Sequence, residues 1–259
     1  LMRSSAASDV YKRQIFNKTE AITLEQSKLT LSKDITVLSF SDSSMVDRNS
    51  SIIKVDSGWI VYSKNSESSI LSFTSDGQFS GYIGHRGNGP GEYTSVYDVV
   101  VNQKSKVLEV LSDGGIFCYT FGGDFLDKKE VTYPAFSFAI DDRQNYWFYV
   151  GNNTTYGDAK MICTDENIAN VAYYLHQKSN MLPMVENNFG RNGEWLTFHE
   201  SLNHDLYTIE NGKLDLSYAM DFPNYKLPKK LHELSGMEVI EELQRSNYAS
   251  IINLSLIHI

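Results

Sequence analysis

The chain has 259 residues, of which 41% are hydrophobic and 12% aromatic, so it is long enough to bury a sizeable core, and a single all-β domain can have this length. Its formal net charge is -9, and this acidic balance argues against nucleic-acid binding, which needs a basic face. No apolar run approaches the roughly 20 residues that a membrane-spanning helix needs, so we predict no transmembrane segment.

The two ends of the chain differ from the rest. Residues 1–14 (LMRSSAASDVYKRQ) and 254–259 (LSLIHI) resemble translated sequencing-adapter sequence, and we expect both to be non-native flanks. Residues 15–253 then form a single incomplete domain. Cys118 and Cys163 are too few for a disulfide framework, and each lies in an apolar run, so we predict two free, buried thiols.

In chain order, two short β-like runs at residues 22–24 and 35–40 precede a weak repeat. Hairpin-turn signals recur at residues 75–77, 122–124, 165–167 and 211–212. Their markers Gly77, Gly123, Asn167 and Gly212 are 46, 44 and 45 residues apart, which is the period of a four-stranded propeller blade. The sequence therefore predicts an all-β chain of four-stranded antiparallel blades.

The three tryptophans give a second marker of the same repeat. Trp59, Trp147 and Trp195 each open a short aromatic or β-branched run upstream of one turn, and we expect each indole to fill the space between adjacent sheets. The predicted blades cover residues 51–83, 96–131, 136–175 and 185–222. Residues 223–245 follow as a connector with prolines and one short helix, and residues 250–253 resemble the start of a fifth blade.

A glycine-rich connector, GHRGNGPGEY at residues 84–93, joins the first two blades. Its glycines and proline forbid a helix and predict tight turns. In one interpretation it is a structural crossing in which Tyr93 packs and Glu92 accepts backbone N–H groups. In the other, His85, Arg86, Glu92 and Tyr93 contact a ligand, since loops on a rigid scaffold carry most binding residues.

Oxygen-bearing side chains near the starts of inner strands are candidates to line a central channel. We assign Asp98, Asp141 and Asn187 to this set, together with Asp142 and Asn188. Such oxygens suit calcium, but turn formation and solvation are the preferred explanation for them. The six histidines show no zinc-type spacing, and no nucleophile elbow occurs, so we assign no metal ligand and no catalytic residue.

The chain resembles the six-bladed β-propeller proteins of bacterial cell envelopes, which are related in fold to NHL-repeat propellers. The resemblance rests on residues 73–79 (FTSDGQF), on the strand end at 82–84 and above all on residues 87–93, which match the G-x-G-P-G-E-Y signature. Pro223 departs from the family, where glycine is usual. The resemblance implies six blades when intact, closure of the last blade by residues 35–40, and export as an envelope lipoprotein of the periplasm or outer membrane.

Two functions remain open at this point. The leading hypothesis is a non-catalytic propeller that binds a partner protein, peptide or glycan over one face and needs no cofactor. The alternative, implied by the resemblance, is a calcium-dependent hydrolase or a lyase that works in the propeller channel. Fold alone does not choose between them, because propellers host unrelated functions.

Overall fold

The computed structural model describes residues 12–15, 35–39, 46, 50–64, 69–151, 157–176, 187–192, 195–234, 237–245 and 248. The chain divides into two compact units. The three-sheet unit comprises residues 22–140 and 144–177, and the C-terminal unit comprises residues 1–21, 141–143 and 178–259. No helix of the described residues is long and apolar enough to cross a membrane.

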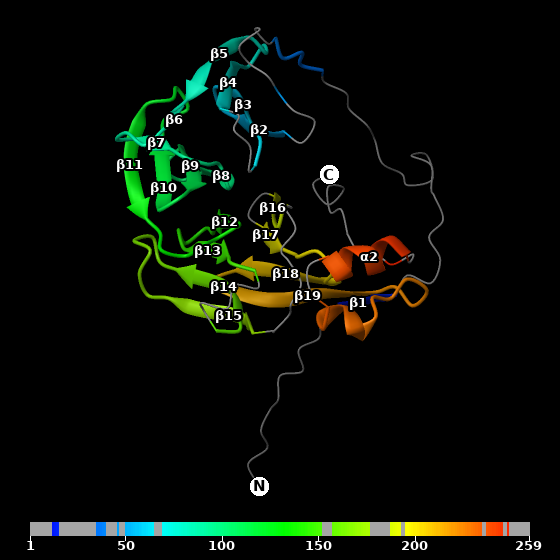
Figure 1. Cartoon of the computed structure of the whole chain (residues 1–259). Coiled ribbons are helices and arrows are strands. Elements are labelled where there is room, and N and C mark those ends of the chain that lie inside the picture. The colour runs from blue at the N-terminus through cyan, green and yellow to red at the C-terminus, as the bar shows by residue number, and fades with distance from the viewer. Residues whose placement is uncertain are drawn as a thin grey trace. The chain divides into compact units, whose positions relative to one another are not determined.

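The three-sheet unit contains three four-stranded antiparallel meanders (Figure 1). The first comprises β2 (Ser51–Val55), β3 (Gly58–Tyr62), β4 (Ile70–Thr74) and β5 (Phe79–Ile83). The second comprises β8 (Asp98–Asn102), β9 (Val107–Ser112), β10 (Gly115–Tyr119) and β11 (Phe125–Glu130). The third comprises β12 (Ser137–Ile140), β13 (Tyr146–Tyr149), β14 (Ala159–Thr164) and β15 (Ala172–His176). These bounds confirm the first three predicted blades.

The third and fourth strands of each sheet are joined by the predicted hairpin turns. In the first sheet, the Thr74 N–H donates to the Gln78 carbonyl at 2.9 Å across the turn. In the second, the Thr120 N–H donates to the Asp124 carbonyl at the same distance. Gly77 and Gly123 have φ values of 89° and 100°, a backbone region that side-chain-bearing residues rarely adopt. The repeat seen in the sequence is therefore a repeat of turn geometry.

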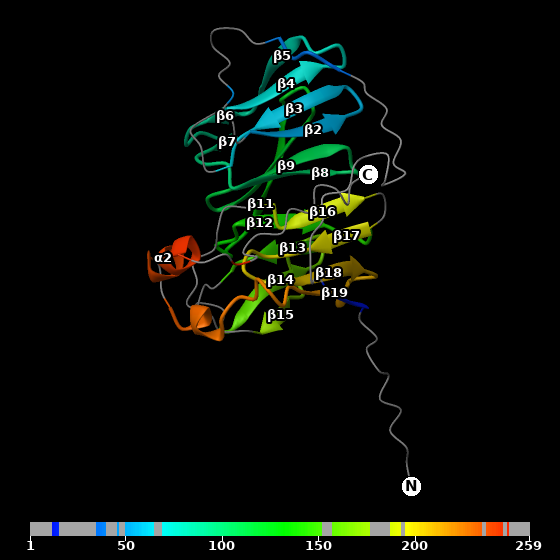
Figure 2. The same cartoon turned by 90° about the vertical axis from the view of Figure 1, so that its right-hand side faces the viewer.

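Two hydrophobic cores hold the three sheets together, one on each face of the second sheet. The strands of the second sheet lie between those of the first and the third (Figure 2). The first core joins Ile60 and Tyr62 of β3 to Leu108 and Val110 of β9. The second core joins the opposite face of β9, including Leu111, to aromatic residues of the third sheet. Side chains alternate between the two faces of a strand. In a sheet buried on both faces, consecutive residues of a strand are therefore apolar, as they are here.

The C-terminal unit contains one five-stranded sheet. Its strands are β16 (Phe189–Asn192), β17 (Trp195–Phe198), β18 (Asp205–Glu210), β19 (Lys213–Asp221) and β1 (Lys12–Ile15). The first four form an antiparallel meander that confirms the fourth predicted blade, whereas β1 adds to the outer edge of β19 in parallel. A 3-10 turn, η2 (Lys229–His232), and helix α2 (Met237–Arg245) follow. Helix α2 is the short helix predicted within residues 223–245.

A cluster of apolar side chains anchors the connector, residues 223–245, within the C-terminal unit. Val239 of α2 and Leu231 of η2 are buried in one cluster with Leu202, which follows β17. The fold is thus all-β, a β-propeller built of four-stranded antiparallel blades.

Residues 22–24 and 250–253 lie outside the described residues, as does the flank at 254–259. Of the predicted run at 35–40, the structure describes residues 35–39, which form no strand and make one parallel bridge between Ser39 and Gln78.

The three tryptophans occupy equivalent strands but not equivalent environments. All three lie in the second strand of their sheet, namely β3, β13 and β17. Trp147 is fully buried and contacts Tyr174, whereas Trp59 is partly buried on the face of β3 opposite Ile60, and Trp195 is 69% exposed. The expectation that each indole fills a space between sheets is therefore wrong for Trp195. The strand was predicted correctly, but the face depends on a one-residue offset that the spacing does not resolve.

Both cysteines are free and buried, as predicted. Burial raises the pKa of the Cys118 thiol to about 12, and the nearby Glu109 carboxylate adds to the shift. At neutral pH this thiol stays protonated and is a poor nucleophile.

Candidate functional site

The glycine-rich connector is built around the Glu92 carboxylate. Short strands β6 (His85–Arg86) and β7 (Glu92–Tyr93) pair in parallel at its base. Oε2 of Glu92 accepts the Gly89 N–H at 2.8 Å, and the Gly87 N–H donates to the Tyr93 carbonyl at 3.0 Å. A Cβ on Gly87 would lie 2.0 Å from Oε2 of Glu92, so any side chain there would displace this carboxylate. The loop is therefore held closed by hydrogen bonds within the connector, one of them to the Glu92 carboxylate.

Tyr93 is a core residue. It is 1% exposed, its hydroxyl donates to the Ile83 carbonyl at 3.2 Å and accepts the Ile70 N–H at 3.3 Å. Burial raises the pKa of this phenol, and its ring meets Tyr119 edge-on with centroids 6.2 Å apart. This packing agrees with the structural interpretation of the connector.

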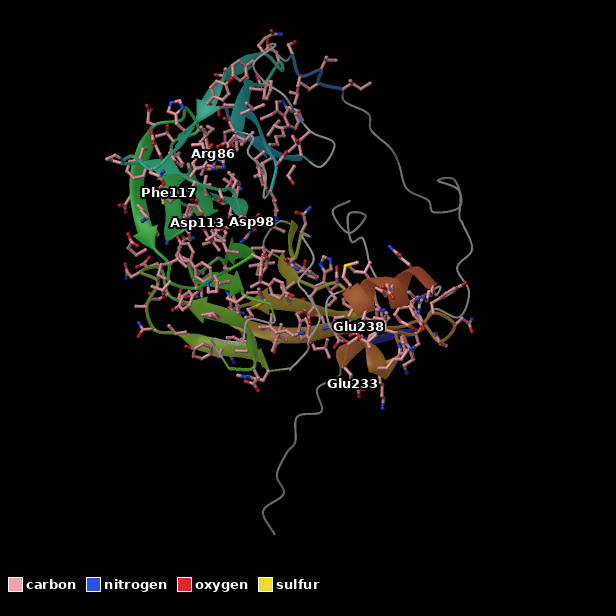
Figure 3. The ribbon with its side chains drawn as sticks, viewed as in Figure 1. Arg86, Asp98, Asp113, Phe117, Glu233 and Glu238 are labelled. Atoms are coloured by element: carbon pink, nitrogen blue, oxygen red, sulfur yellow. The ribbon has the colours of Figure 1, made fainter. Side chains whose placement is uncertain are left out.

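His85 and Arg86 are the two predicted ligand residues of the connector whose side chains are exposed. Nε of Arg86 donates to the Thr94 carbonyl at 2.8 Å, which holds this side chain beside the connector's exit (Figure 3). Of the four residues proposed from the sequence, Glu92 and Tyr93 thus shape the loop, and His85 and Arg86 lie at its surface.

The exit of the connector is tied to the next sheet by Asp113, which the sequence did not indicate (Figure 3). Its carboxylate accepts hydrogen bonds from Thr94 Oγ1 at 2.7 Å, from Ser95 Oγ at 3.1 Å and from the Tyr97 hydroxyl. These donors lower the pKa of Asp113, with the Thr94 hydroxyl first. One carboxylate in the β9–β10 turn therefore holds three residues of the segment that enters β8.

Asp98, the first predicted channel residue, is buried at the start of β8. Its Oδ1 forms an ion pair with Lys64 Nζ at 2.8 Å, and its Oδ2 accepts the Phe138 N–H at 3.1 Å. Lys64 follows β3 and Phe138 lies in β12, so this carboxylate links all three sheets of the unit. In this position Asp98 has a structural role.

The other two predicted channel residues lie in the C-terminal unit. Asp141 is buried, and its Oδ1 accepts the Arg143 N–H at 2.9 Å. Asn187 is exposed, whereas its neighbour Asn188 is buried and donates from Nδ2 to the His199 carbonyl at 3.2 Å. Within the described ranges, no three His, Cys, Asp or Glu side chains gather as a metal site.

A buried polar chain crosses the interface between the second and third sheets. The Lys129 ammonium donates to the Tyr146 hydroxyl at 2.6 Å, and that hydroxyl donates to Glu109 Oε2 at 2.8 Å. Glu109 is 2% exposed and also accepts Asn102 Nδ2 at 3.0 Å. Burial and the Glu109 charge raise the pKa of Tyr146, so the phenol keeps its proton and acts as a donor. A cavity of about 340 Å³ borders these residues.

The C-terminal unit carries a larger hollow on the face of its sheet, with a volume of about 580 Å³. Its lining combines one exposed indole, hydroxyl groups and three carboxylates, from Trp195, Thr208, Ser217, Asp142, Glu210 and Asp215. Thr208 and Ser217 are hydrogen-bonded to each other across the strands. At the rim, Arg143 Nη2 donates to Asn211 Oδ1 at 3.1 Å, which orients that amide. Trp195 is the most exposed aromatic side chain of the described residues.

A family match covers almost the whole sequence. Residues 8–256 match the family described as Domain of unknown function (DUF4934). The chain belongs to this family. A comparison with curated proteins finds no match.

Two solved structures place this DUF4934 chain among bacterial β-propellers. It is similar to the "Putative exported protein (BF0058)" of Bacteroides fragilis, with a TM-score of 0.76 and 16% identity over 92% of this chain and 70% of that chain. It is also similar to a member of the DUF4221 family from Bacteroides vulgatus, with a TM-score of 0.51 and 10% identity over 76% of this chain and 64% of that chain. At these identities the likeness shows the fold alone.

Most of the residues that line the hollow of this DUF4934 chain were not predicted from the sequence. Trp195 was identified, but as a packing residue, and Asp142 was considered only for a central channel. The signal that could have found the hollow is the polar alternation of β18 and β19. Thr208 pairs with Asp215, and Glu210 pairs with Lys213, so polar side chains gather on one face of the hairpin. A blade face that packs on a neighbour is apolar, as in the two cores of the three-sheet unit.

Proposed function

We propose that this protein is a non-catalytic, exported binding propeller that holds a partner protein, peptide or glycan. The observation that carries the proposal is the exposed Trp195 indole at the edge of the 580 Å³ hollow. A large aromatic side chain left in water next to polar groups is typical of binding surfaces, because its apolar ring contributes area at low entropic cost.

The other groups of the hollow supply the polar part of recognition. Small-ligand sites combine an apolar surface with a few placed hydrogen-bonding groups, and this hollow offers hydroxyls, an amide and carboxylates around one ring. None of the three lining carboxylates forms an ion pair or a side-chain hydrogen bond within the described part of the chain. These acceptors are therefore available to a ligand that donates hydrogen bonds.

Binding to immobilised glycan and peptide panels, followed by calorimetry of the hits, tests the proposal. We expect Trp195→Ala to weaken the leading hit at least tenfold, since a central aromatic contact contributes about 2 kcal/mol or more. The matched control is Tyr173→Ala, which removes a 47% exposed ring from β15 in the other unit and should leave affinity unchanged. Equal binding by wild type and Trp195→Ala would contradict the assignment of the hollow.

The envelope location and the size of the ring belong to the same proposal. Support comes from the likeness to a protein named as exported and from the family signature at residues 87–93. We propose a six-bladed ring in the intact protein, carried on an envelope lipoprotein. Fractionation of cells that express the intact reading frame tests the location. Calcium-dependent thermal stabilisation of that protein would instead favour the calcium-dependent enzyme.

A further inference from the structure

The cavity between the second and third sheets carries two opposite charges on its wall. Its volume is about 340 Å³, and all its lining residues belong to the three-sheet unit. The ammonium of Lys129 and the carboxylate of Glu109 both line it. Elsewhere the second and third sheets meet through apolar and aromatic side chains, which form their shared core. The cavity wall is therefore a polar exception in a largely apolar interface.

The two charges lie close together without pairing directly. Both contact the Tyr146 hydroxyl, which accepts a hydrogen bond from Lys129 Nζ at 2.6 Å and donates one to Glu109 Oε2 at 2.8 Å. In the part of the chain that the structure describes, neither charge forms an ion pair. Because a buried charge without a counter-charge is costly, a ligand that supplies the opposite charges would stabilise this arrangement.

Each charged group also keeps hydrogen-bonding capacity. A lysine ammonium has three N–H donors, and that of Lys129 uses two of them, on the Tyr146 hydroxyl and on the Glu166 carbonyl at 3.5 Å. A carboxylate has about four acceptor positions, and that of Glu109 accepts from the Tyr146 hydroxyl and from Asn102 Nδ2. One donor and at least one acceptor position therefore remain for a ligand.

The rest of the lining suits a small ligand with polar and apolar parts. Amides, a hydroxyl and two aliphatic side chains accompany the charges, from Asn102, Gln144, Asn167, Ser105, Val107 and Leu126. Two further lining carboxylates, Asp127 and Glu166, belong to exposed residues, and their negative charge attracts an ammonium group. The volume lies at the lower end of the range for small-molecule sites, about 300–1,000 Å³.

We propose that this cavity binds a free α-amino acid in its zwitterionic form. The ligand carboxylate pairs with the Lys129 ammonium and the ligand ammonium with the Glu109 carboxylate, while the ligand side chain contacts Val107 and Leu126. An α-amino acid carries both charged groups on one carbon atom, so it matches two opposite charges that share one hydroxyl partner. A ligand with a single charge would leave one of the two wall groups without a counter-charge. This cavity is separate from the Trp195 hollow, and the inference does not depend on what the hollow binds.

Calorimetry of the full chain with a panel of free α-amino acids identifies the leading hit. That hit is then compared with its α-amide, which lacks the negative charge, and with its N-acetyl derivative, which lacks the positive charge. We expect each derivative to bind about tenfold or more weakly, because each loses one charge-assisted hydrogen bond. Equal binding of either derivative would overturn the zwitterion, and no binding of any amino acid at millimolar concentration would overturn the site.

Two substitutions of similar size test the two charged groups. Glu109→Gln keeps an acceptor for the Tyr146 hydroxyl but removes the charge, and Lys129→Met keeps an unbranched side chain; each should weaken binding of the hit about tenfold or more. The matched control is Lys128→Met, the same change on the preceding residue of β11, which does not line the cavity and should leave affinity unchanged. Trp195→Ala should also have no effect, so failure of the hollow and failure of the cavity are distinguishable. Unchanged affinity in both Glu109→Gln and Lys129→Met would overturn the site.

Nuclear magnetic resonance locates the ligand in the wild-type protein, so the test does not depend on the folding of a variant. The hit should shift the side-chain amide resonances of Asn102, Gln144 and Asn167, which line the cavity. The internal control is Asn211, which lines the Trp195 hollow and should not respond. Shifts at Asn211 alone would overturn the assignment of the ligand to this cavity.

Discussion

Replacing Asp98 with alanine should strongly lower the free energy of unfolding of the three-sheet unit, although only one side chain is shortened. The carboxylate and its Lys64 partner are 8% and 10% exposed, and their charged atoms lie 2.8 Å apart. Asp98 also accepts the Val99 N–H at 3.0 Å and the Phe138 N–H at 3.1 Å. Alanine would remove the counter-charge of a buried ammonium and the acceptor of a buried N–H at once.

We expect Asp98→Ala to lower the free energy of unfolding by about 3–5 kcal/mol, the usual loss when one partner of a buried ion pair is removed. Asp98→Asn should cost less, because an amide oxygen still accepts a backbone N–H. The matched control is Asp56→Ala, which breaks a pair with Lys106 at 3.1 Å whose side chains are 80% and 53% exposed. That change should cost less than about 1 kcal/mol.

Urea unfolding followed by far-UV circular dichroism measures these differences, and a double-mutant cycle with Lys64→Met isolates the pair. A loss below about 1 kcal/mol for Asp98→Ala, equal to that of Asp56→Ala, would refute the structural role of the carboxylate. If Asp98 lined a ligand channel instead, alanine would leave stability nearly unchanged and lower ligand affinity.

Two further substitutions and one pH titration test other parts of the fold. Gly91→Ala should cost about 2 kcal/mol in urea unfolding, because Gly91 has a φ of 75° and a Cβ there would lie 2.6 Å from the Phe125 ring; an unchanged midpoint would contradict this geometry. Tyr146→Phe removes the hydroxyl that donates to Glu109 and should cost about 1–3 kcal/mol at neutral pH, whereas a neutral result would show that Glu109 finds another donor. The Asp113 carboxyl should titrate below the ordinary aspartate value of about 3.9 by NMR. Because its folded pKa is lowered, its contribution to stability is present above that value and is lost as pH falls through the folded pKa, and an unshifted titration would contradict the three hydrogen bonds.

Local signals explain why so much of the architecture was predictable. Hairpin turns depend on a few adjacent residues, and Gly77 and Gly123 supply the positive φ that the turns require. The strands between them are short and apolar, so the bounds of all four sheets follow closely from the sequence. The connector's internal closure was predictable for the same reason, since Glu92 bonds to Gly89 only three residues away.

The residues of the candidate sites depended on contacts between distant parts of the chain. Asp98 was identified from the sequence but its partners were not, because the sequence does not show that Lys64 and the Phe138 N–H converge on it. Tyr146, Lys129 and Glu109 come from three strands, and no local pattern links them.

The sequence by itself determined the four blades that the structure describes, their turns and the type of their strands, because these properties arise from turn chemistry and from a period of about 45 residues. The tertiary structure alone decided which side of each sheet a residue occupies. Trp147 and Trp195 both lie in the second strand of a sheet, yet one indole is fully buried and the other is 69% exposed. A shift of one residue exchanges the two faces of a strand, and only the packing of whole sheets fixes that shift.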